Sequence, residues 1–525
     1  MKSMKYIWMI ASLSVLVSCS DFLEERSQDT YYVTSYTDLD ELLIGDCYLP
    51  VRAASKLSDT SDPGYFIHYL ADEIEEQHGN IWSWDSDNKE TIFGYYTWQQ
   101  RVGETHNYNG YLRENATWTE IYRLLNVANN IIDCVKDVPQ NTEELKLEVK
   151  RVNGEAHFLR AAYYFWLVNL YGKPYEKATA NTDLGVPVKT SSQVNDVIYS
   201  RNTVQQVYNQ VLSDLQQAES DLSVTRKLPT IYRADITAVH LLMSRVYLYM
   251  QNWDMAKKYA DKVLEAKAEL VDLNSLNGSF LKKSSVENIF SMGGAEIPCS
   301  MCNYYQSFRV SHDLYNAYKD NDLRKSAYWW KYDDFVGYVK MEVSSSADAD
   351  PSEEDYYERK FYRAAANKKA PVSDRFLFRV AEAYLNKAEA ELYLGNDGVA
   401  RKTLNDLCAK RYDEANPYTY DCSGETLAKA IREERRLELA LEGHRWFDLR
   451  RYSVCEKYPE SKQIIHDYTY YEDDTEIKER HRFVLEAFDK AYTLPIPQEV
   501  IEFNTGMPNN DRPVREHIVV SINKK

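Results

Sequence analysis

The stretch RFLFRVAEAYLNKAEAELYLG, residues 375–395, predicts an amphipathic helix with a well-marked end. Glycine commonly follows the last residue of a helix, and Gly395 takes that position. A second helical pattern, DGVARKTLNDLCAKR, follows at residues 397–411. The two segments together predict an antiparallel helical hairpin. The apolar face of the first helix repeats with a period of 3.6 residues, at Leu377, Val380, Ala381, Tyr384, Leu385, Ala388 and Leu392.

The same plan occurs upstream, in residues 234–250 and 254–266. Ser244 and Ala256 are twelve residues apart, as are Ala388 and Ala400, and such small residues suit the contact between two helices. Tyr247 and Trp253 fall where a tetratricopeptide repeat has aromatic residues. Residues 148–172 and 203–222 predict a further pair. We therefore expect a mainly α fold, a tetratricopeptide-like helical-hairpin scaffold with long loop-rich insertions.

Two regions interrupt the helical pattern, residues 60–118 and residues 275–372. The first is rich in Gly, Asn, Asp and aromatic residues, and the second contains the acidic tract SSSADADPSEED. Long insertions in a compact domain are usually functional or disordered. The aromatic residues favour a functional role for both insertions.

The N-terminus predicts a signal peptide, residues 1–18, followed by Cys19. Lys2 and Lys5 precede an uncharged apolar run from Tyr6 to Val17, which is too short for a membrane helix of ~20 residues. The residues before Cys19 resemble the lipobox of a bacterial lipoprotein, in which the cysteine becomes the lipid-bearing N-terminus. The alternative is an ordinary signal peptide with a chance cysteine.

The charge of the chain argues against nucleic-acid partners. It has 63 Lys and Arg against 81 Asp and Glu, and removal of Lys2 and Lys5 with the leader gives 61 − 81 = −20. Such a surface repels phosphate backbones. Cys299 and Cys302 form a single CxxC without a second pair of ligands nearby, so we do not expect a zinc site. We expect these two cysteines to form a local disulfide or to remain free thiols. We expect neither a metal nor a cofactor.

The aromatic residues of the insertions predict a ligand site. A sugar ring has a slightly positive face of C–H groups, which stacks on the flat, electron-rich face of an aromatic ring. Asp85, Asp87, Asn88 and Gln99 lie close by in sequence and suit sugar hydroxyls. The alternative is that these rings pack the loops onto the helices. Trp82, Trp98 and Trp329 are the first candidates, with rings expected to face solvent, in a set comprising Trp82, Trp84, Tyr95, Tyr96, Trp98, Tyr304, Tyr305, Tyr328, Trp329 and Trp330.

Four blocks, taken together and in this order, resemble the SusD/RagB family of outer-membrane nutrient-binding lipoproteins of the Bacteroidetes. They are the lipobox with CSDFLEE, GEAHFLRAAYYFWLVNLYG at 154–172, RVAEAYLNKAEAELYLG at 379–395, and IREERRLELALEGHRWFDLRRY at 431–452 followed by YTLPIPQEVIEFNTG. The chain departs from the family at Asn153, where Arg is common, and in its tail NTGMPNNDRP. These departures leave the class intact and the subgroup open.

The resemblance implies one SusD-like domain over residues 19–525, anchored by lipid at Cys19 in the outer membrane and facing the cell exterior. It implies a binding protein, not an enzyme, that delivers oligosaccharides to a SusC-like TonB-dependent β-barrel transporter. Peptide binding, as in the RagB branch, is one alternative, and a scaffold that binds no ligand is another. A hydrolase would require two facing carboxylates within ~5 to 10 Å in a cleft.

The charged residues of the 431–452 block predict a structural role. Glu433, Glu434, Arg435, Arg436 and Glu438 recur at i,i+3 and i,i+4 spacings, where opposite charges pair along one helix.

Overall fold

The computed structural model describes residues 33–50, 63–77, 86–105, 114, 116–193, 197–295, 297, 307–341, 371–471 and 477–520. Its helices are α2 (Tyr36–Leu42), α3 (Ser86–Tyr96), α4 (Ala116–Cys134), α5 (Glu143–Tyr171), α6 (Val204–Leu222), α7 (Ile236–Tyr249), α8 (Trp253–Ala266), α10 (His312–Ala317), α11 (Arg324–Tyr328), α13 (Val380–Tyr393), α14 (Asp397–Cys408), α15 (Gly424–Glu438), α16 (Arg445–Ser453) and α17 (Gln498–Phe503). The shorter helical turns are Leu43–Cys47, Ile67–Leu70, Leu273–Ser275 and Lys490–Tyr492. The strands are β1 (Ile74–Glu76), β2 (Asn288–Ser291), β3 (Phe308–Val310), β4 (Trp329–Tyr332), β5 (Phe335–Tyr338), β6 (Leu377–Arg379), β7 (Ile464–Tyr471), β8 (Ile477–Leu485) and β9 (His517–Val520).

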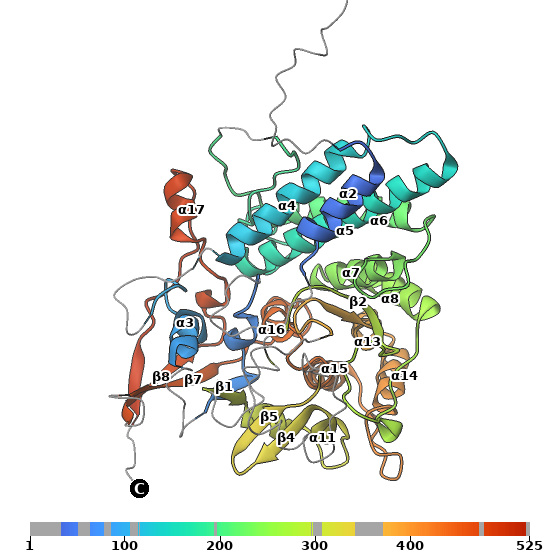
Figure 1. Cartoon of the computed structure of the whole chain (residues 1–525). Helices are drawn as coiled ribbons and strands as arrows, with labels where there is room; N and C mark the ends of the chain where they lie inside the picture. The colour runs from blue at the N-terminus through green and yellow to red at the C-terminus, as the bar shows by residue number, and fades with distance from the viewer. Residues whose placement is uncertain are drawn as a thin grey trace, which may run out of the picture.

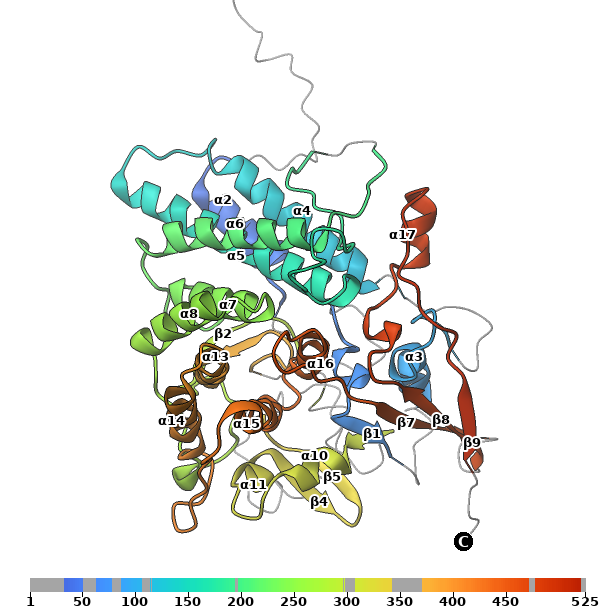
Figure 2. The same cartoon turned by 180° about the vertical axis from the view of Figure 1, so that it is seen from behind.

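The three predicted hairpins are confirmed. Helix α5 packs between α4 and α6, α7 packs on α8, and α13 packs on α8, α14 and α15. These helices form a stack along one side of the molecule. Strands β1, β7 and β8 lie on the other side, whereas β2 lies beside α7 and α13 (Figures 1 and 2). The mainly α, tetratricopeptide-like fold is therefore confirmed. None of the helices in the described ranges is both long and apolar enough to cross a membrane.

Small and aromatic side chains hold the hairpins together, as their spacing predicts. The Ser244 hydroxyl donates a 2.9 Å hydrogen bond to the carbonyl of Ala256, which brings α7 and α8 into close contact. Trp253, at the start of α8, stacks on Tyr393 at the end of α13, with ring centroids 4.1 Å apart. Gly395 ends the α13 turn with a φ of +84°, a conformation that glycine adopts without strain.

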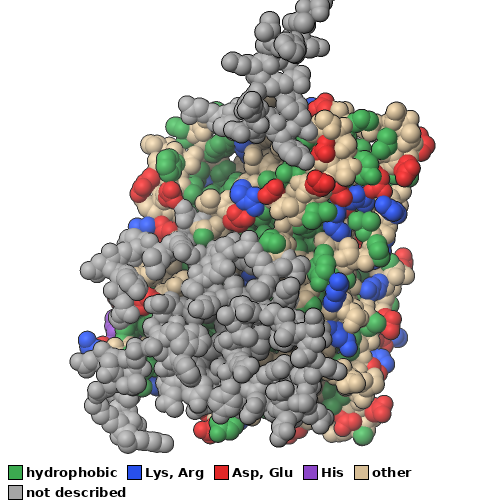
Figure 3. All heavy atoms as spheres, viewed as in Figure 1, with side chains coloured by type: hydrophobic (Ala, Val, Ile, Leu, Met, Phe, Trp, Pro, Cys, Tyr) green, Lys and Arg blue, Asp and Glu red, His purple; other side chains and the backbone are tan. Residues whose placement is uncertain are grey.

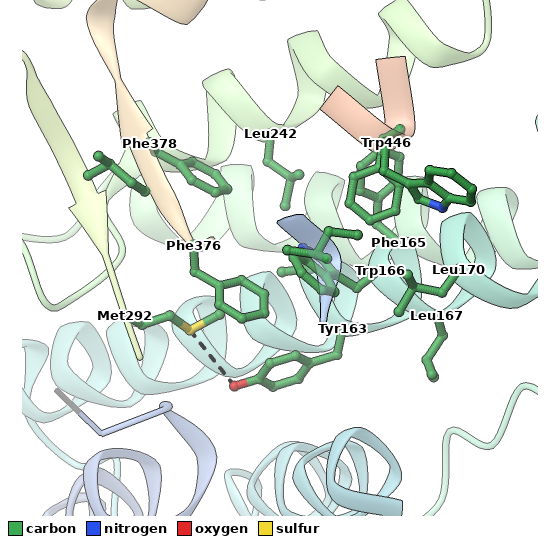
Figure 4. Packing of buried hydrophobic residues seen from close by; sticks show 14 of the residues in the cluster. Tyr163, Phe165, Trp166, Leu167, Leu170, Leu242, Met292, Phe376, Phe378 and Trp446 are labelled. Carbon is green, nitrogen blue, oxygen red and sulfur yellow. Dashed lines mark hydrogen bonds between the residues drawn. The ribbon is translucent and has the colours of Figure 1, made fainter. Parts of the chain in front are cut away.

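The core is centred on the second half of α5, which is buried on every side from Phe158 to Tyr171. A helix that is buried on every side lies inside the protein core, between other elements, instead of at the surface. Figure 4 shows Trp166 of α5 beside Phe376 and Tyr163 pointing toward Met292. The Trp166 and Phe376 centroids are 4.4 Å apart, so the core joins the helical stack to the segment leading into β6.

The charged block at 431–452 is buried, and this corrects the prediction of pairs along one helix. Within residues 433–438, Glu433 and Arg436 do approach to 3.6 Å. The other partners lie on distant elements: Arg379 donates to Glu438 and Glu442 at 2.7 Å each and to Glu287 at 2.8 Å. We call this set the buried ion cluster; it comprises Arg324, Lys340, Arg379, Arg411, Asp322, Glu287, Glu434, Glu438 and Glu442.

The outer surface of the helical stack differs from this interior. Figure 3 shows acidic and basic side chains interspersed over it, as on a face that contacts water. Pairs such as Lys402 and Asp406 on α14, whose charged groups are 2.6 Å apart, are exposed there. Exposed pairs of this kind contribute little to stability.

Candidate ligand-binding face

The predicted site residues divide between described and undescribed parts of the chain. Trp82, Trp84, Asp85, Tyr304 and Tyr305 lie outside the described residues, as does Cys19. Asn88 lies on α3, but the structure does not describe its side chain or that of Asp87. The remaining candidates lie on α3 and the turn after it, or on α11 and β4.

Trp98 is fully buried, so the expectation that its ring faces solvent is wrong. The indole nitrogen donates a 3.0 Å hydrogen bond to the carbonyl of Leu70. The ring stacks on the imidazole of His466, with centroids 4.4 Å apart and an interplanar angle of 21°. Trp98 therefore joins the turn after α3 to β7, which is the packing role considered as the alternative.

The backbone explains why this ring points inward. Residues 86–96 form a helix where an irregular insertion was expected, and Trp98 follows that helix with a φ of +52°. The amide of Gln99 then bonds back to the carbonyl of Gly94 at 2.9 Å, which closes the helix end. A left-handed backbone is costly for a bulky residue. Burial of the indole offsets that cost.

Tyr95 and Tyr96 are buried as well. Tyr95 stacks on Phe66 with centroids 3.9 Å apart. Tyr96 stacks on His466 at 4.0 Å, and its hydroxyl accepts a 3.0 Å hydrogen bond from the amide of Glu76 on β1. Burial raises the pKa of the Tyr96 hydroxyl well above its usual range. Both tyrosines fix α3 against the segment that carries β1.

The second aromatic cluster behaves in the same way, with one exception. Tyr328 and Trp329 are 0% and 2% exposed, so the expected solvent-facing ring is again wrong for Trp329. Trp330 is half-buried, and its indole lies over Gly337 on the paired strand. A Cβ at Gly337 would lie 2.2 Å from the indole nitrogen, so this glycine makes room for the ring. Of the predicted tryptophans in the described ranges, Trp330 is the one that is not fully buried, although its indole nitrogen is.

Strands β1 and β3 bring the two insertions together. They pair antiparallel, and the amide of Gln77 donates a 2.8 Å hydrogen bond to the carbonyl of Ser307. On β3, Arg309 reaches the β4–β5 turn, where it donates to the Asp334 carboxylate at 2.8 Å. Residues near 77, 307 and 334 are therefore neighbours, although they are far apart in sequence.

A polar patch marks this junction. The Arg309 guanidinium donates to the Glu75 carboxylate at 2.9 Å and to the Gln77 amide oxygen at 3.0 Å. Glu75 also bonds the imidazole of His312 at 2.6 Å. The Glu75 and His312 side chains are about one-third exposed and that of Asp334 is 61% exposed. Carboxylate, guanidinium and imidazole groups in this arrangement can bond hydroxyl groups at the surface.

Sequence reasoning missed this polar patch. Its members lie about 230 residues apart, and no local pattern links Glu75 with Arg309. Alternation in FRV around Arg309 was the available signal for a strand, but a three-residue strand is below what periodicity can resolve. Gln99, which was expected near a sugar, is buried and donates to the Thr97 hydroxyl at 3.0 Å.

A buried carboxyl pair anchors the patch to the helical stack. Asp72 accepts from Arg445 at 2.7 and 2.9 Å, and these bonds hold the segment before β1 against α16. Glu73 beside it is 2% exposed and accepts a 3.2 Å bond from the amide of Leu441. Its other oxygen, Oε1, has no hydrogen-bond partner in the described part of the chain. Burial raises the pKa of Glu73 to about 7.

We expect Glu73 to make stability depend on pH. Its folded-state pKa is above the unfolded value, so its contribution is complete below pH 4.5 and is lost as pH rises to about 7. Relative to Glu73→Gln, the natural protein should lose about 3 kcal/mol of unfolding free energy between pH 4.5 and 8. Urea unfolding at both pH values measures this. A difference that stays constant with pH would contradict the assignment.

Comparison with known proteins supplies the class. Residues 292–512 match the model of the SusD family, and residues 64–248 match a family described as starch-binding associating with outer membrane. A SusD-like protein of Formosa agariphila is 25% identical over 383 residues, 64% of this chain and 72% of that protein. The starch-binding protein SusD of Bacteroides thetaiotaomicron is 32% identical over 123 residues, 22% of this chain and 20% of that protein.

Solved structures agree on the fold. A SusD superfamily protein from Bacteroides thetaiotaomicron superposes with a TM-score of 0.65 at 23% identity, covering 91% of this chain and all of the other. A SusD-like carbohydrate binding protein from Bacteroides vulgatus gives a TM-score of 0.65 at 20% identity, covering 90% of this chain and 98% of the other. The chain belongs to the SusD/RagB family.

Proposed function

We propose that the protein binds oligosaccharides at the junction of β1, β3 and the β4–β5 hairpin. The observation that carries this proposal is the half-buried Trp330 on the β4–β5 hairpin, whose turn residue Asp334 is bonded by Arg309 of the polar patch. A half-buried indole on the same hairpin as a hydroxyl-bonding carboxylate suits a sugar ring. Relatives that are named starch-binding or carbohydrate binding support the ligand class.

The undescribed candidate residues fit this location by chain connection alone. Trp82 follows Gln77 by five residues, so the chain limits their separation to about 18 Å. Tyr304 precedes Ser307 by three residues, which sets a limit of about 11 Å. Because Gln77 and Ser307 are hydrogen-bonded, Trp82, Trp84, Tyr304 and Tyr305 remain candidates for the same site.

Tyr95, Tyr96, Trp98, Tyr328 and Trp329 would then act as support. The rings of Tyr96 and Trp98 are buried against His466 of β7, and the ring of Trp329 is buried against Tyr338 of β5. These contacts fix the segments that would present the site. A peptide ligand is the second candidate, because the charged Glu75 and Arg309 could also bond a backbone. The face of C–H groups on a sugar ring suits the indole of Trp330, so we favour the glycan.

A glycan array with the chain from residue 20 onward tests the proposal. We expect saturable binding to at least one class of oligosaccharide, and much weaker binding by Trp330→Ala. A peptide library serves as the parallel arm. Binding to peptides without binding to any glycan would identify the RagB-like alternative, and binding to neither would favour a scaffold.

We further propose that residues 1–18 are a signal peptide, that residues 19–525 form one domain, and that lipid on Cys19 anchors it at the outer face of the outer membrane. Replacing Cys19 with alanine should release the protein from the membrane fraction or leave it unprocessed. Ser18→Ala, which keeps a small residue before the cysteine, is the matched control. If intact Cys19→Ala protein remained in the membrane fraction as the natural protein does, this result would contradict the lipoprotein assignment.

Delivery to a SusC-like TonB-dependent β-barrel transporter completes the proposal. A lipid anchor holds a protein on one side of a membrane, so uptake of a bound glycan requires a separate channel. We propose that the role is binding without catalysis. The bound oligosaccharide should therefore keep its chain length on prolonged incubation with the protein.

A further inference from the structure

The most exposed apolar side chains of the described chain gather on one flank. Five of the six lie between residues 488 and 519. The sixth is Ile198, whose neighbour Tyr199 donates a 3.0 Å hydrogen bond from its backbone amide to the side-chain Oδ1 of Asn504, one residue after Phe503. Figure 2 shows α17, β8 and β9 along this side. We call it the C-terminal flank; its exposed apolar members are Phe503 (78%), Val514 (73%), Ile198 (69%), Phe488 (66%), Ile518 (62%) and Val519 (60%).

Strand β9 provides the flank with an open edge. The sheet order is β7-β8-β9, so β9 pairs with β8 on one side only within the described residues. The register places Ile518 opposite Arg482 and Val519 opposite His481. Exposed edge strands usually carry a lysine, a proline or a bulge that prevents further pairing. The sequence HIVV of β9 carries none of these.

We propose that the free edge of β9 receives an extended strand from a different protein. Successive residues of a strand point to opposite faces, so Ile518 and Val519 are exposed on opposite faces of the sheet. A lipid surface or a helix laid on one face would cover only one of them. A strand added at the edge places cross-strand neighbours beside both side chains.

The charge of the flank indicates the chemistry of that partner strand. Residues 486–520 contain six Asp and Glu and three Lys and Arg, a balance of 3 − 6 = −3. A second copy of this chain would bring an equally acidic flank, which disfavours self-pairing. The partner strand is therefore apolar at alternating positions and neutral or basic around them. Main-chain hydrogen bonds would supply affinity, and apolar contacts would supply specificity.

Site-specific photocrosslinking in the native membrane tests this inference independently of the ligand. A photoreactive phenylalanine analogue replaces Ile518 or Val519 in the full-length protein, and crosslinked peptides are mapped by mass spectrometry. The control position is Val399 on α14, which is 46% exposed and far from the flank. We expect adducts from positions 518 and 519 to map to neighbouring residues of one segment in another protein.

The double variant Ile518→Lys/Val519→Lys provides the second arm, with the crosslinker at Phe503. The adduct yield should fall about tenfold or more, the scale of a lost interface hot spot. Val399→Lys should leave it unchanged. Adducts to lipid, adducts between two copies of this chain, or a yield at 518 no higher than at 399 would each overturn the inference.

Discussion

Replacing Glu438 with alanine is expected to lower the free energy of unfolding by about 3–5 kcal/mol, the cost of breaking a buried ion pair. Glu438 is 0% exposed and accepts from Arg379 at 2.7 Å, from Arg411 at 2.8 Å and from Arg324 at 3.2 Å. Its removal leaves these guanidinium groups buried with less countercharge. Burial alone would raise the pKa of Glu438, but Arg411 and Arg379 outweigh it and hold that pKa well below its usual range.

Urea unfolding of the natural protein and three variants measures the effect. Glu438→Gln keeps the shape of the side chain and removes its charge. It should therefore lower the free energy of unfolding by a similar amount, about 3–5 kcal/mol. Lys402→Ala breaks the exposed pair with Asp406, and its effect on the free energy of unfolding should be small. Equal effects of Glu438→Ala and Lys402→Ala would show that the buried ion cluster does not stabilise the fold.

Replacing Trp98 with alanine should also destabilise the protein strongly, by about 3–5 kcal/mol, as for other buried Trp side chains. The variant loses the contact with His466 and the hydrogen bond to Leu70, and it keeps a backbone conformation that alanine adopts unfavourably. Trp330→Ala should cost less, about 1–2 kcal/mol, because Trp330 is only half-buried. Thermal melting of both variants shows which of the two tryptophans stabilises the fold, and which is available to contact a ligand without supporting the fold.

A small melting shift for Trp98→Ala would contradict its role as a support residue. A loss of stability at Trp330 as large as that at Trp98 would instead place Trp330 among the buried rings. Either outcome is informative, because both residues were predicted from sequence as ligand contacts, with Trp98 among the first candidates.

The helical stack was predictable because its determinants are local. Apolar residues at a 3.6-residue period define α7 and α13, and the helix-ending Gly395 lies where its φ of +84° requires it. Even the contact between Ser244 and Ala256 follows from their spacing. The two insertions lacked a sustained period, so the helix α3 within residues 60–118 was missed.

The direction in which a side chain points was harder to predict from the sequence than the element that carries it. Whether Trp98 faces inward depends on one left-handed backbone conformation and on His466, which lies 368 residues further along the chain. Arginine and glutamate at helical spacing also predicted pairs along one helix, whereas Glu438 is buried and paired with Arg379 and Arg411 from other elements. A spacing rule cannot detect such partners, because tertiary packing brings them together.

Calorimetric titration of the chain from residue 20 onward, with the strongest oligosaccharide from the glycan array, tests the central claim most directly. We predict saturable binding that Trp330→Ala weakens by about 1–3 kcal/mol, the scale of stacking on an aromatic ring. Tyr384→Ala, at a half-buried ring on α13 in the helical stack, should bind as the natural protein does. Absence of saturable binding by the folded protein, or equal binding by Trp330→Ala, would contradict the proposed glycan site.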